Sequence, residues 1–437
     1  MKLWRALPVV AALLLLTPNA SWVYPIDGYV LTGIRRLERL RLRLVGELDG
    51  TVPVGGGRQR IADIWLHAVR TGGAVGNTAP GGIPAGDAPI RAGGLDTDFP
   101  EPDAALSREI ERLFSDRDPS YSLALLEITP GRPMRFASMR PDVLYSPGSV
   151  GKLAIAVGLF AELARRYPDD VDSRQTLLRN REVTAGKWIV QDHHKVPLFD
   201  PDTREVGFRR IRQGDVFSLY EWLDHMLSAS ANAAASTVWK EVMLMRVFGR
   251  DYPPAPAAED SFFTETPRAE LQKIAVSVVN DPLRELGIGE DEWRQGSFFT
   301  RAGKRIVPGV KSYASPRALL LFLLRIEQGR VVDVWSSLEL KRLMYMTEKR
   351  IRYASSPALA EAAVYFKSGS LYRCKKEPGF QCGKYQGNVD NYMNSVAIVE
   401  KPDGRLYLVA LMSNVLKINS AVEHQTLATY IDRILAR

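Results

Sequence analysis

One short stretch, residues 145–153 (Tyr-Ser-Pro-Gly-Ser-Val-Gly-Lys-Leu), constrains this chain more than any other. Its Pro-Gly turn precedes an apolar run over 153–164 that predicts a helix. Ser149 then falls in the first turn of this helix, and Lys152 follows three residues later. Because residues at that spacing share a helix face, the lysine amine can reach the serine hydroxyl. A buried lysine loses its charge readily and can then take the serine proton, so the stretch indicates a nucleophilic serine with a lysine base.

Taken alone, Ser-x-x-Lys fits a second interpretation equally well. A serine that caps a helix N-terminus, followed by a surface lysine, has the same pattern. The remainder of the chain therefore has to decide between the two.

Charge and composition limit the class of protein. The chain has 437 residues, 46% of them hydrophobic and 25% charged, which is typical of a soluble globular protein with one large or two modest domains. The net charge of +8 favours anionic surroundings such as lipid head groups, cell-wall polymers or carboxylated substrates. Zinc-finger spacing, ribonucleoprotein motifs and basic-aromatic platforms are absent from the sequence, which argues against nucleic acid as a partner.

The N-terminal part of the chain predicts export. Lys2 and Arg5 precede a short apolar run over 6–16, the pattern of a signal peptide or N-terminal anchor within residues 1–20. We therefore expect the protein in the periplasm or outside the cell, with membrane association through the N-terminus if the segment is retained. Residues 21–102 form a leading segment whose part from 71 onward is crowded with glycine and proline, as in a linker. The main domain is predicted over 103–437.

The predicted elements of the main domain define its fold class. Helical patterns cover 104–114, most of 153–360 and 421–435, and strand patterns cover 121–129, 134–139, 363–366, 395–400 and 406–412. Segments 186–210 and 249–259 read as irregular inserts. Strands separated by helices in this order predict an α/β protein of the α+β kind: a five-stranded antiparallel sheet flanked by helices, plus an all-helical lobe.

Two further motifs follow Ser149 and Lys152 along the chain. Ser230-Ala231-Asn232 precedes an apolar run, and Lys367-Ser368-Gly369 directly follows the strand predicted over 363–366, at a strand edge. Alone, the first could be a loop or cap pair and the second an ordinary strand-edge lysine. Together and in this order, the three motifs resemble those of serine β-lactamases and penicillin-binding proteins (DD-peptidases), and are most similar to the class A-like β-lactamases. The resemblance covers residues 104–437.

The resemblance implies a role for each motif residue. Ser149 would attack a carbonyl carbon and become acylated, while Lys152 takes its proton directly or through water. Ser230 would pass a proton to the departing amide nitrogen. The backbone N–H groups of Ser149 and Ser370 would form the oxyanion hole.

The same resemblance implies four substrate-binding residues. Asn232 would hold the side-chain amide of the substrate. Lys367 would attract its carboxylate, to which Ser368 would hydrogen-bond. Gly369, which lacks a side chain, would leave the strand edge open to an extended substrate.

The deacylation base is harder to assign. The Glu-x-x-Leu-Asn motif, whose glutamate activates the deacylating water in class A enzymes, is absent between Asn232 and Lys367. Glu290 and Glu292 lie in about the right neighbourhood, and Glu265 is a further candidate. Each of these also fits a solvated surface acid.

The cysteines and histidines add two expectations. In an exported protein, Cys374 and Cys382 predict one disulfide that closes a short loop bordering the site. His193 and His194 follow Asp192 without a third ligand at metal spacing, so neither a metal nor a cofactor is expected.

These observations lead to an exported serine hydrolase that forms an acyl-enzyme and hydrolyses the β-lactam amide. The alternatives are a D-alanyl-D-alanine carboxypeptidase, which is a penicillin-binding protein acting on cell-wall peptide, and a sensor that binds penicillin without turnover. The expected partner is a small-molecule β-lactam or a cell-wall peptide. The oligomeric state is not predicted.

Overall fold

The computed structural model describes residues 99–437 except 200–205, 346, 348–349, 361 and 402. The predicted signal segment and almost all of the leading segment therefore lie outside the described residues. Within the described part of the chain, every helix is too short or too polar to cross a membrane.

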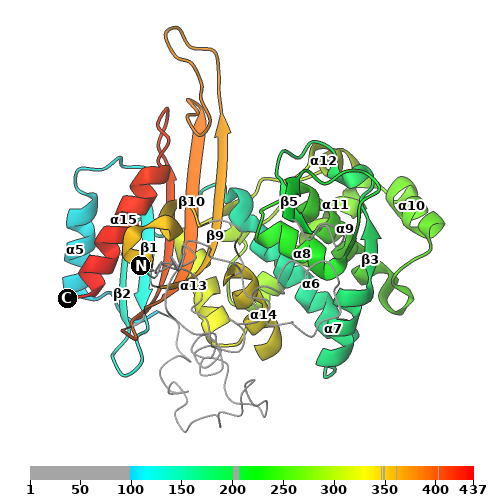
Figure 1. The fold of residues 1–437 in the computed structure, drawn as a ribbon, viewed down its shortest axis with the longest axis horizontal. Helices are drawn as coiled ribbons and strands as arrows, with labels where there is room; N and C mark the ends of the chain where they lie inside the picture. Colours follow the sequence, from blue (N-terminus) through cyan, green and yellow to red (C-terminus); the bar gives the residue numbers. More distant parts are fainter. Residues whose placement is uncertain (1–98, 200–205, 346, 348–349, 361, 402) are drawn as a thin grey trace, which may run out of the picture.

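A five-stranded sheet forms the centre of the molecule (Figure 1). Its strand order is β2-β1-β11-β10-β9, and every neighbouring pair is antiparallel. The predicted fold class is thereby confirmed. The strands are β1 (Ser122–Glu127), β2 (Arg135–Met139), β9 (Ala363–Arg373), β10 (Asp390–Glu400) and β11 (Leu406–Asn414).

Helices cover the sheet and build a separate lobe beside it (Figure 1). Within the described residues, the first and last helices, α5 and α15, begin and end where the sequence predicts. The helices are α5 (Ala104–Phe114), α6 (Lys152–Arg166), α7 (Val171–Asn180), α8 (Leu219–Leu227), α9 (Asn232–Phe248), α10 (Pro256–Glu265), α11 (Arg268–Glu285), α12 (Arg301–Ile306), α13 (Pro316–Glu327), α14 (Val334–Tyr345) and α15 (Ala421–Leu435).

The two faces of the sheet belong to two hydrophobic cores. Along β1, Leu123 and Leu125 join the core that contains the apolar residues of α5 and α15. Ala124 and Leu126 point to the opposite face and join the larger core of the helical lobe. This follows from the two-residue period of a strand, which sends successive side chains to opposite faces. A fully buried strand therefore connects both cores.

The helical lobe is built around α6. Most of its residues from Lys152 to Leu163 are buried, so α6 lies inside the lobe rather than on its surface. It packs against α9 and α11.

The two predicted inserts contain regular structure. Within 186–210, β4 (Val196–Phe199) and β5 (Val206–Arg209) form an antiparallel hairpin. Within 249–259, α10 already begins at Pro256. The expectation of irregular structure is therefore wrong for part of both segments. Strand pairing orders the first segment, and a proline in the first helical turn favours the helix in the second; the mixed composition of the segments does not predict either.

The edge strand β9 meets the helical lobe at a single-turn 3₁₀ helix, η2 (Gly148–Gly151), which leads directly into α6. Gly369 of β9 is in tight contact with this turn. A Cβ atom at Gly369 would collide with the Pro147 carbonyl oxygen and lie 2.9 Å from the Ser149 backbone nitrogen. The absence of a side chain at this position therefore sets how closely the sheet approaches Ser149.

We expect Gly369→Ala to destabilise the protein by about 1–3 kcal/mol, since the added methyl group overpacks a rigid backbone contact. Urea unfolding followed by tryptophan fluorescence measures this. Gly186→Ala is the matched control, because a Cβ atom there meets nothing within 4 Å. Equal free energies of unfolding for the two variants would contradict the role given to this contact.

Candidate active site

Ser149 lies in the second position of η2, at the entrance to α6. The preceding Gly148 has a positive φ of 54°, a conformation that glycine adopts without strain. A Cβ atom at Gly148 would lie 2.7 Å from the Ser370 backbone nitrogen. The backbone of η2 is thus in close contact with the backbone of β9 around Ser149.

Lys152 lies one turn beyond Ser149, as the spacing predicts, and its side chain is completely buried. Its Nζ is 3.0 Å from Ser149 Oγ. It also donates to the Ser230 carbonyl oxygen at 2.5 Å and to Asn232 Oδ1 at 2.8 Å. The ring of Phe299 lies against the same amine, with its centroid 4.8 Å from Nζ. The amine is therefore enclosed by protein groups.

Burial lowers the pKa of Lys152 well below its ordinary value, and the nearby charge of Lys367 lowers it further. Asp192 acts in the opposite direction. A neutral amine next to a serine hydroxyl is the state that can accept the hydroxyl proton.

Ser230 connects the two lysines. Its Oγ accepts a hydrogen bond from Lys367 Nζ at 2.8 Å and lies 3.3 Å from Lys152 Nζ. The residue lies in the short connection between α8 and α9 and has a φ of +59°. A left-handed conformation costs a serine of the order of 1–2 kcal/mol, and here it directs the hydroxyl and the carbonyl oxygen of one residue toward Lys152.

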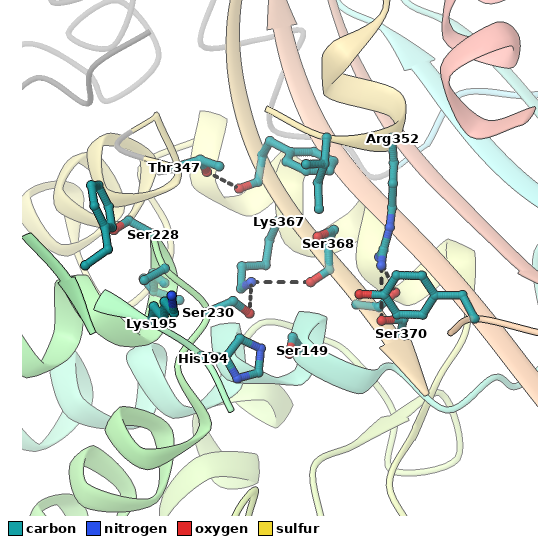
Figure 2. Close-up of a pocket in the computed structure, with 17 residues that line it drawn as sticks. Ser149, His194, Lys195, Ser228, Ser230, Thr347, Arg352, Lys367, Ser368 and Ser370 are labelled. Carbon is teal, nitrogen blue, oxygen red and sulfur yellow. Dashed lines mark hydrogen bonds between the residues drawn. The ribbon is translucent and has the colours of Figure 1, made fainter. Parts of the chain in front are cut away.

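Lys367 is buried on β9, and its side chain reaches Ser230 within the pocket (Figure 2). Burial, with a further contribution from the Arg352 charge, lowers its pKa to about 7. Near neutral pH this side chain can therefore change between its charged and neutral forms.

A pocket of about 590 Å³ opens over these residues (Figure 2). Ser149, Ser230, Lys367, Ser368, Gly369 and Ser370 all line it. Three cationic side chains line it as well, and the part of the chain that the structure describes contributes no carboxylate to its wall. The cations are Lys195, Arg352 and Lys367. The wall therefore favours an anionic ligand.

The structure thus gathers the residues of the three motifs around one pocket. Lys152 and Asn232 are not among the residues that line the pocket, but Lys152 donates to Asn232 and to the two serines Ser149 and Ser230. Their geometry is established here, while their roles in catalysis remain predictions.

Arg352 is a pocket residue that the sequence analysis missed. It donates to the Gly369 carbonyl oxygen at 2.8 Å and to Ser370 Oγ at 3.1 Å. Its guanidinium lies 5.2 Å from the centre of the Tyr385 ring. The residue belongs to a one-turn 3₁₀ helix, Arg352–Ser355, which has no recognisable motif, so only the tertiary structure reveals it.

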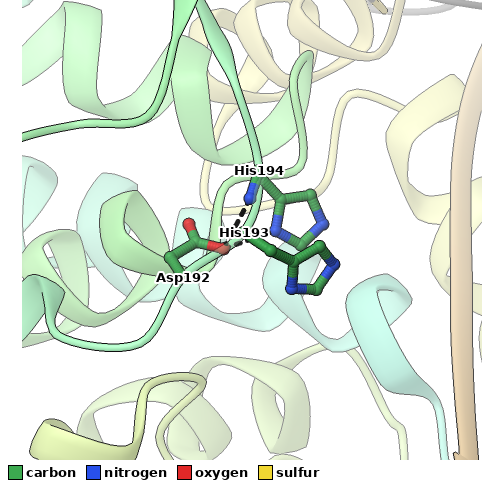
Figure 3. A group of neighbouring side chains, drawn as sticks. All are labelled: Asp192, His193 and His194. Carbon is green, nitrogen blue, oxygen red and sulfur yellow. Dashed lines mark hydrogen bonds and ion pairs between the residues drawn. The ribbon is translucent and has the colours of Figure 1, made fainter.

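His194 is a second missed residue. It lines the same pocket as Ser149 (Figure 2) and forms a hydrogen-bonded pair with Asp192 (Figure 3). The ligand atoms of Asp192, His193 and His194 lie within 4.8 Å of one another. However, the Asp192 carboxylate already accepts hydrogen bonds from His194 and from the backbone of α9, which makes an Asp–His pair the better description than a metal site.

The two glutamates considered for deacylation lie outside the pocket wall. The Glu292 carboxylate accepts from the Gly289 backbone N–H at 2.6 Å and thereby closes its own turn. Glu290 is largely exposed and lies 3.5 Å from Arg294. Local contacts of the turn and solvent occupy both carboxylates, so this structure offers no support for either as the residue that activates water. Glu265, at the end of α10, is also absent from the wall.

The structure pairs Cys374 with Cys382 in a disulfide. The bridge lies in the connection between β9 and β10, which also contains Tyr385. Because Tyr385 lines the pocket, this connection borders the site as the sequence predicts.

Comparison with known proteins yields matches among solved structures alone. Neither a protein-family model nor a curated protein matches the chain. A class A β-lactamase from Bacteroides cellulosilyticus DSM 14838 matches with a TM-score of 0.50 and 15% identity, covering 76% of this chain and 97% of that one. The TLA-1 extended-spectrum β-lactamase matches with a TM-score of 0.51 and 14% identity, covering 76% and 99%. PBP-A matches with a TM-score of 0.47 and 18% identity, covering 78% and 97%.

At these identities the likeness concerns the fold, and it spans nearly the full length of the matched β-lactamases. It agrees with the sheet order and the helical lobe described above. The main domain of this protein therefore has the fold of the serine β-lactamases.

Proposed function

We propose that the protein is a serine hydrolase that forms an acyl-enzyme at Ser149 and hydrolyses the amide bond of β-lactams. The observation that carries this proposal is the chain of short contacts from Ser149 through Lys152 and Ser230 to Lys367. It joins a nucleophile, a lysine base, a hydroxyl and a cation in one buried network.

The network suggests how protons move during acylation. Ser149 Oγ attacks the carbonyl carbon while neutral Lys152 takes its proton. The proton then passes through Ser230 Oγ to the departing amide nitrogen, which completes the exchange of an amide bond for an ester bond. The negative charge that develops on the carbonyl oxygen is stabilised by the backbone N–H groups of Ser149 and Ser370.

The charge of the pocket supports a carboxylated substrate. Lys367, Ser368 and Arg352 present two cations and a hydroxyl along β9. Because β9 is the edge strand of the sheet, its outer side can also pair with an extended amide backbone. β-Lactams of the penicillin type and peptides that end in a carboxylate share these features.

A D-alanyl-D-alanine carboxypeptidase is the second candidate. It is favoured by the pocket wall, which lacks a carboxylate among the described residues, and by the open edge of β9. The apolar run over 6–16 that follows Lys2 and Arg5 supports export for either candidate. We therefore also propose that the protein works outside the cytoplasm, which fractionation of producing cells can check.

Intact-mass analysis after mixing with benzylpenicillin tests the acyl-enzyme. We expect the parent protein to gain the mass of one penicillin and Ser149→Ala to gain none, because the nucleophile is lost. Ser115→Ala, at the exposed end of α5, serves as the control and should behave as the parent. An adduct of equal yield in Ser149→Ala would remove the nucleophile assignment.

Turnover then separates the candidate functions. Many chromogenic cephalosporin molecules hydrolysed per protein support the β-lactamase. A single stoichiometric burst, with release of D-alanine from a peptide ending in D-alanyl-D-alanine, supports the carboxypeptidase. A stable adduct without either activity supports the non-turnover sensor.

The pH dependence of acylation tests the pairing of the two lysines. The reactive form of Lys152 is neutral, so the acylation rate rises as pH increases through its pKa, which burial and Lys367 lower. Lys367→Met removes one of these two causes. We therefore expect the acid limb of the profile to move to higher pH in this variant, measured with saturating fluorescent penicillin over about pH 5–10.

Lys195→Met is the control for this measurement. Lys195 is a cation of the same pocket wall but does not contribute to the lowered pKa of Lys152, so the limb should stay in place. A limb that stays in place in Lys367→Met as well, or moves to lower pH, would refute the coupling.

A further inference from the structure

An acyl-enzyme needs a base for its second half-reaction, and the described pocket offers no carboxylate for this task. An ester at Ser149 is hydrolysed by a water molecule that must give up a proton as it attacks. Among the described residues, the wall of the pocket contains one group besides the lysines that is suited to accept this proton near neutral pH, which is the imidazole of His194.

Asp192 fixes this imidazole in position (Figure 3). His194 Nδ1 lies 2.6 Å from Asp192 Oδ1, which also accepts the backbone N–H of His194 at 3.0 Å. Asp192 Oδ2 accepts the backbone N–H of Ala233, in the first turn of α9, at 2.8 Å. The carboxylate is thereby held at a helix N-terminus, where negative charge is stabilised.

Ionisation of the pair is consistent with this arrangement. Although burial acts in the opposite direction, the hydrogen bonds from His194 and Ala233 lower the pKa of Asp192 to about 2, so the carboxylate is charged. With Nδ1 as the donor to this carboxylate, Nε2 is the acceptor of the imidazole. Burial lowers the pKa of His194, which keeps the ring neutral near pH 7.

The position of His194 makes it available to Ser149. The side chains of His194, Ser149 and Ser230 line the same pocket (Figure 2). His194 is close enough to Lys152 for the charge of that amine to act on it. A water molecule that hydrogen-bonds Nε2 inside this pocket would share the cavity with an ester at Ser149.

We propose that His194, oriented by Asp192, is the general base that activates the deacylating water. This inference rests on the acyl-enzyme proposed above. In the step, the water oxygen forms a bond to the ester carbonyl carbon and one of its protons passes to His194 Nε2. The bond between that carbon and Ser149 Oγ then breaks, and the proton held by His194 is returned to Ser149 Oγ. The products are the free acid and the regenerated serine. Asp192 is a positioning residue in this scheme.

The test compares His194→Ala with His193→Phe. His193 is exposed and does not line the pocket, and its ring stacks on that of His194 with centroids 4.4 Å apart, so phenylalanine keeps this ring contact while it removes the titratable nitrogens. Each variant is acylated with benzylpenicillin, freed of excess drug, and followed by intact mass as the adduct decays. We expect His194→Ala to be acylated as fully as the parent but to lose its adduct about 10²–10⁴-fold more slowly. The His193→Phe adduct should decay at the parent rate.

Two further measurements distinguish a base from a merely structural residue. Added imidazole should accelerate decay of the His194→Ala adduct and leave the parent unaffected. In the parent, decay should slow as pH falls through the pKa of His194, since protonation removes the acceptor. The charged groups that face this ring are Asp192 and His193 in its own loop, Lys152 of α6, and Lys195 and Lys367 of the pocket wall.

The outcomes separate the two proposals. Decay of the His194→Ala adduct at the parent rate overturns the role of His194 and leaves the acyl-enzyme standing. A parent adduct that persists at every pH also overturns the role of His194 and leaves the acyl-enzyme standing. If His194→Ala fails to fold, a parent decay rate that does not fall on the acid side overturns the role by itself. Failure of the parent to form any adduct removes the acyl-enzyme, and this inference with it.

Discussion

The burial of one amine, that of Lys152, is the constraint on which the site depends. A charged ammonium group removed from water is very unfavourable, so the group is neutralised or paired. Here its partners are a hydroxyl, a carbonyl oxygen and a side-chain amide oxygen, from Ser149, Ser230 and Asn232, and none of them carries a full charge. The protein therefore holds an amine whose stable state inside the fold is the basic one.

The rest of the architecture supplies that burial from segments far apart in the chain. α6 brings the amine, the α8–α9 connection brings Ser230, and the edge strand β9 brings Lys367. The lobe and the sheet meet where η2 contacts β9, and two glycines allow the backbones to approach closely. Neither part contains the site alone, so the site forms only when both cores are packed against each other.

Sequence patterns predicted the sheet, the helices at both ends of the domain and the three motifs, because each has a strong local signal. The strand β9 was predicted to end near Phe366, yet it continues to Arg373. The last residues of β9 are exposed, so the sequence there lacks the alternation of apolar and polar residues that marks a half-buried strand. Pairing with β10 holds these residues in the sheet. Arg352 and His194 were missed for a related reason. A one-turn helix and a loop carry them, and only tertiary contacts bring them to the pocket.

The connection between β9 and β10 affects ligand recognition in the part of the pocket that Tyr385 lines. Tyr385 lies against Arg352 in a segment whose two ends continue from paired strands, and the Cys374–Cys382 bridge shortens its free length. The bridged connection restricts the conformations of the Tyr385 ring before a ligand binds. The conformational entropy of the segment around Tyr385 is then lost during folding rather than on ligand binding. This favours ligands whose shape already fits the ordered segment over ligands that require it to move.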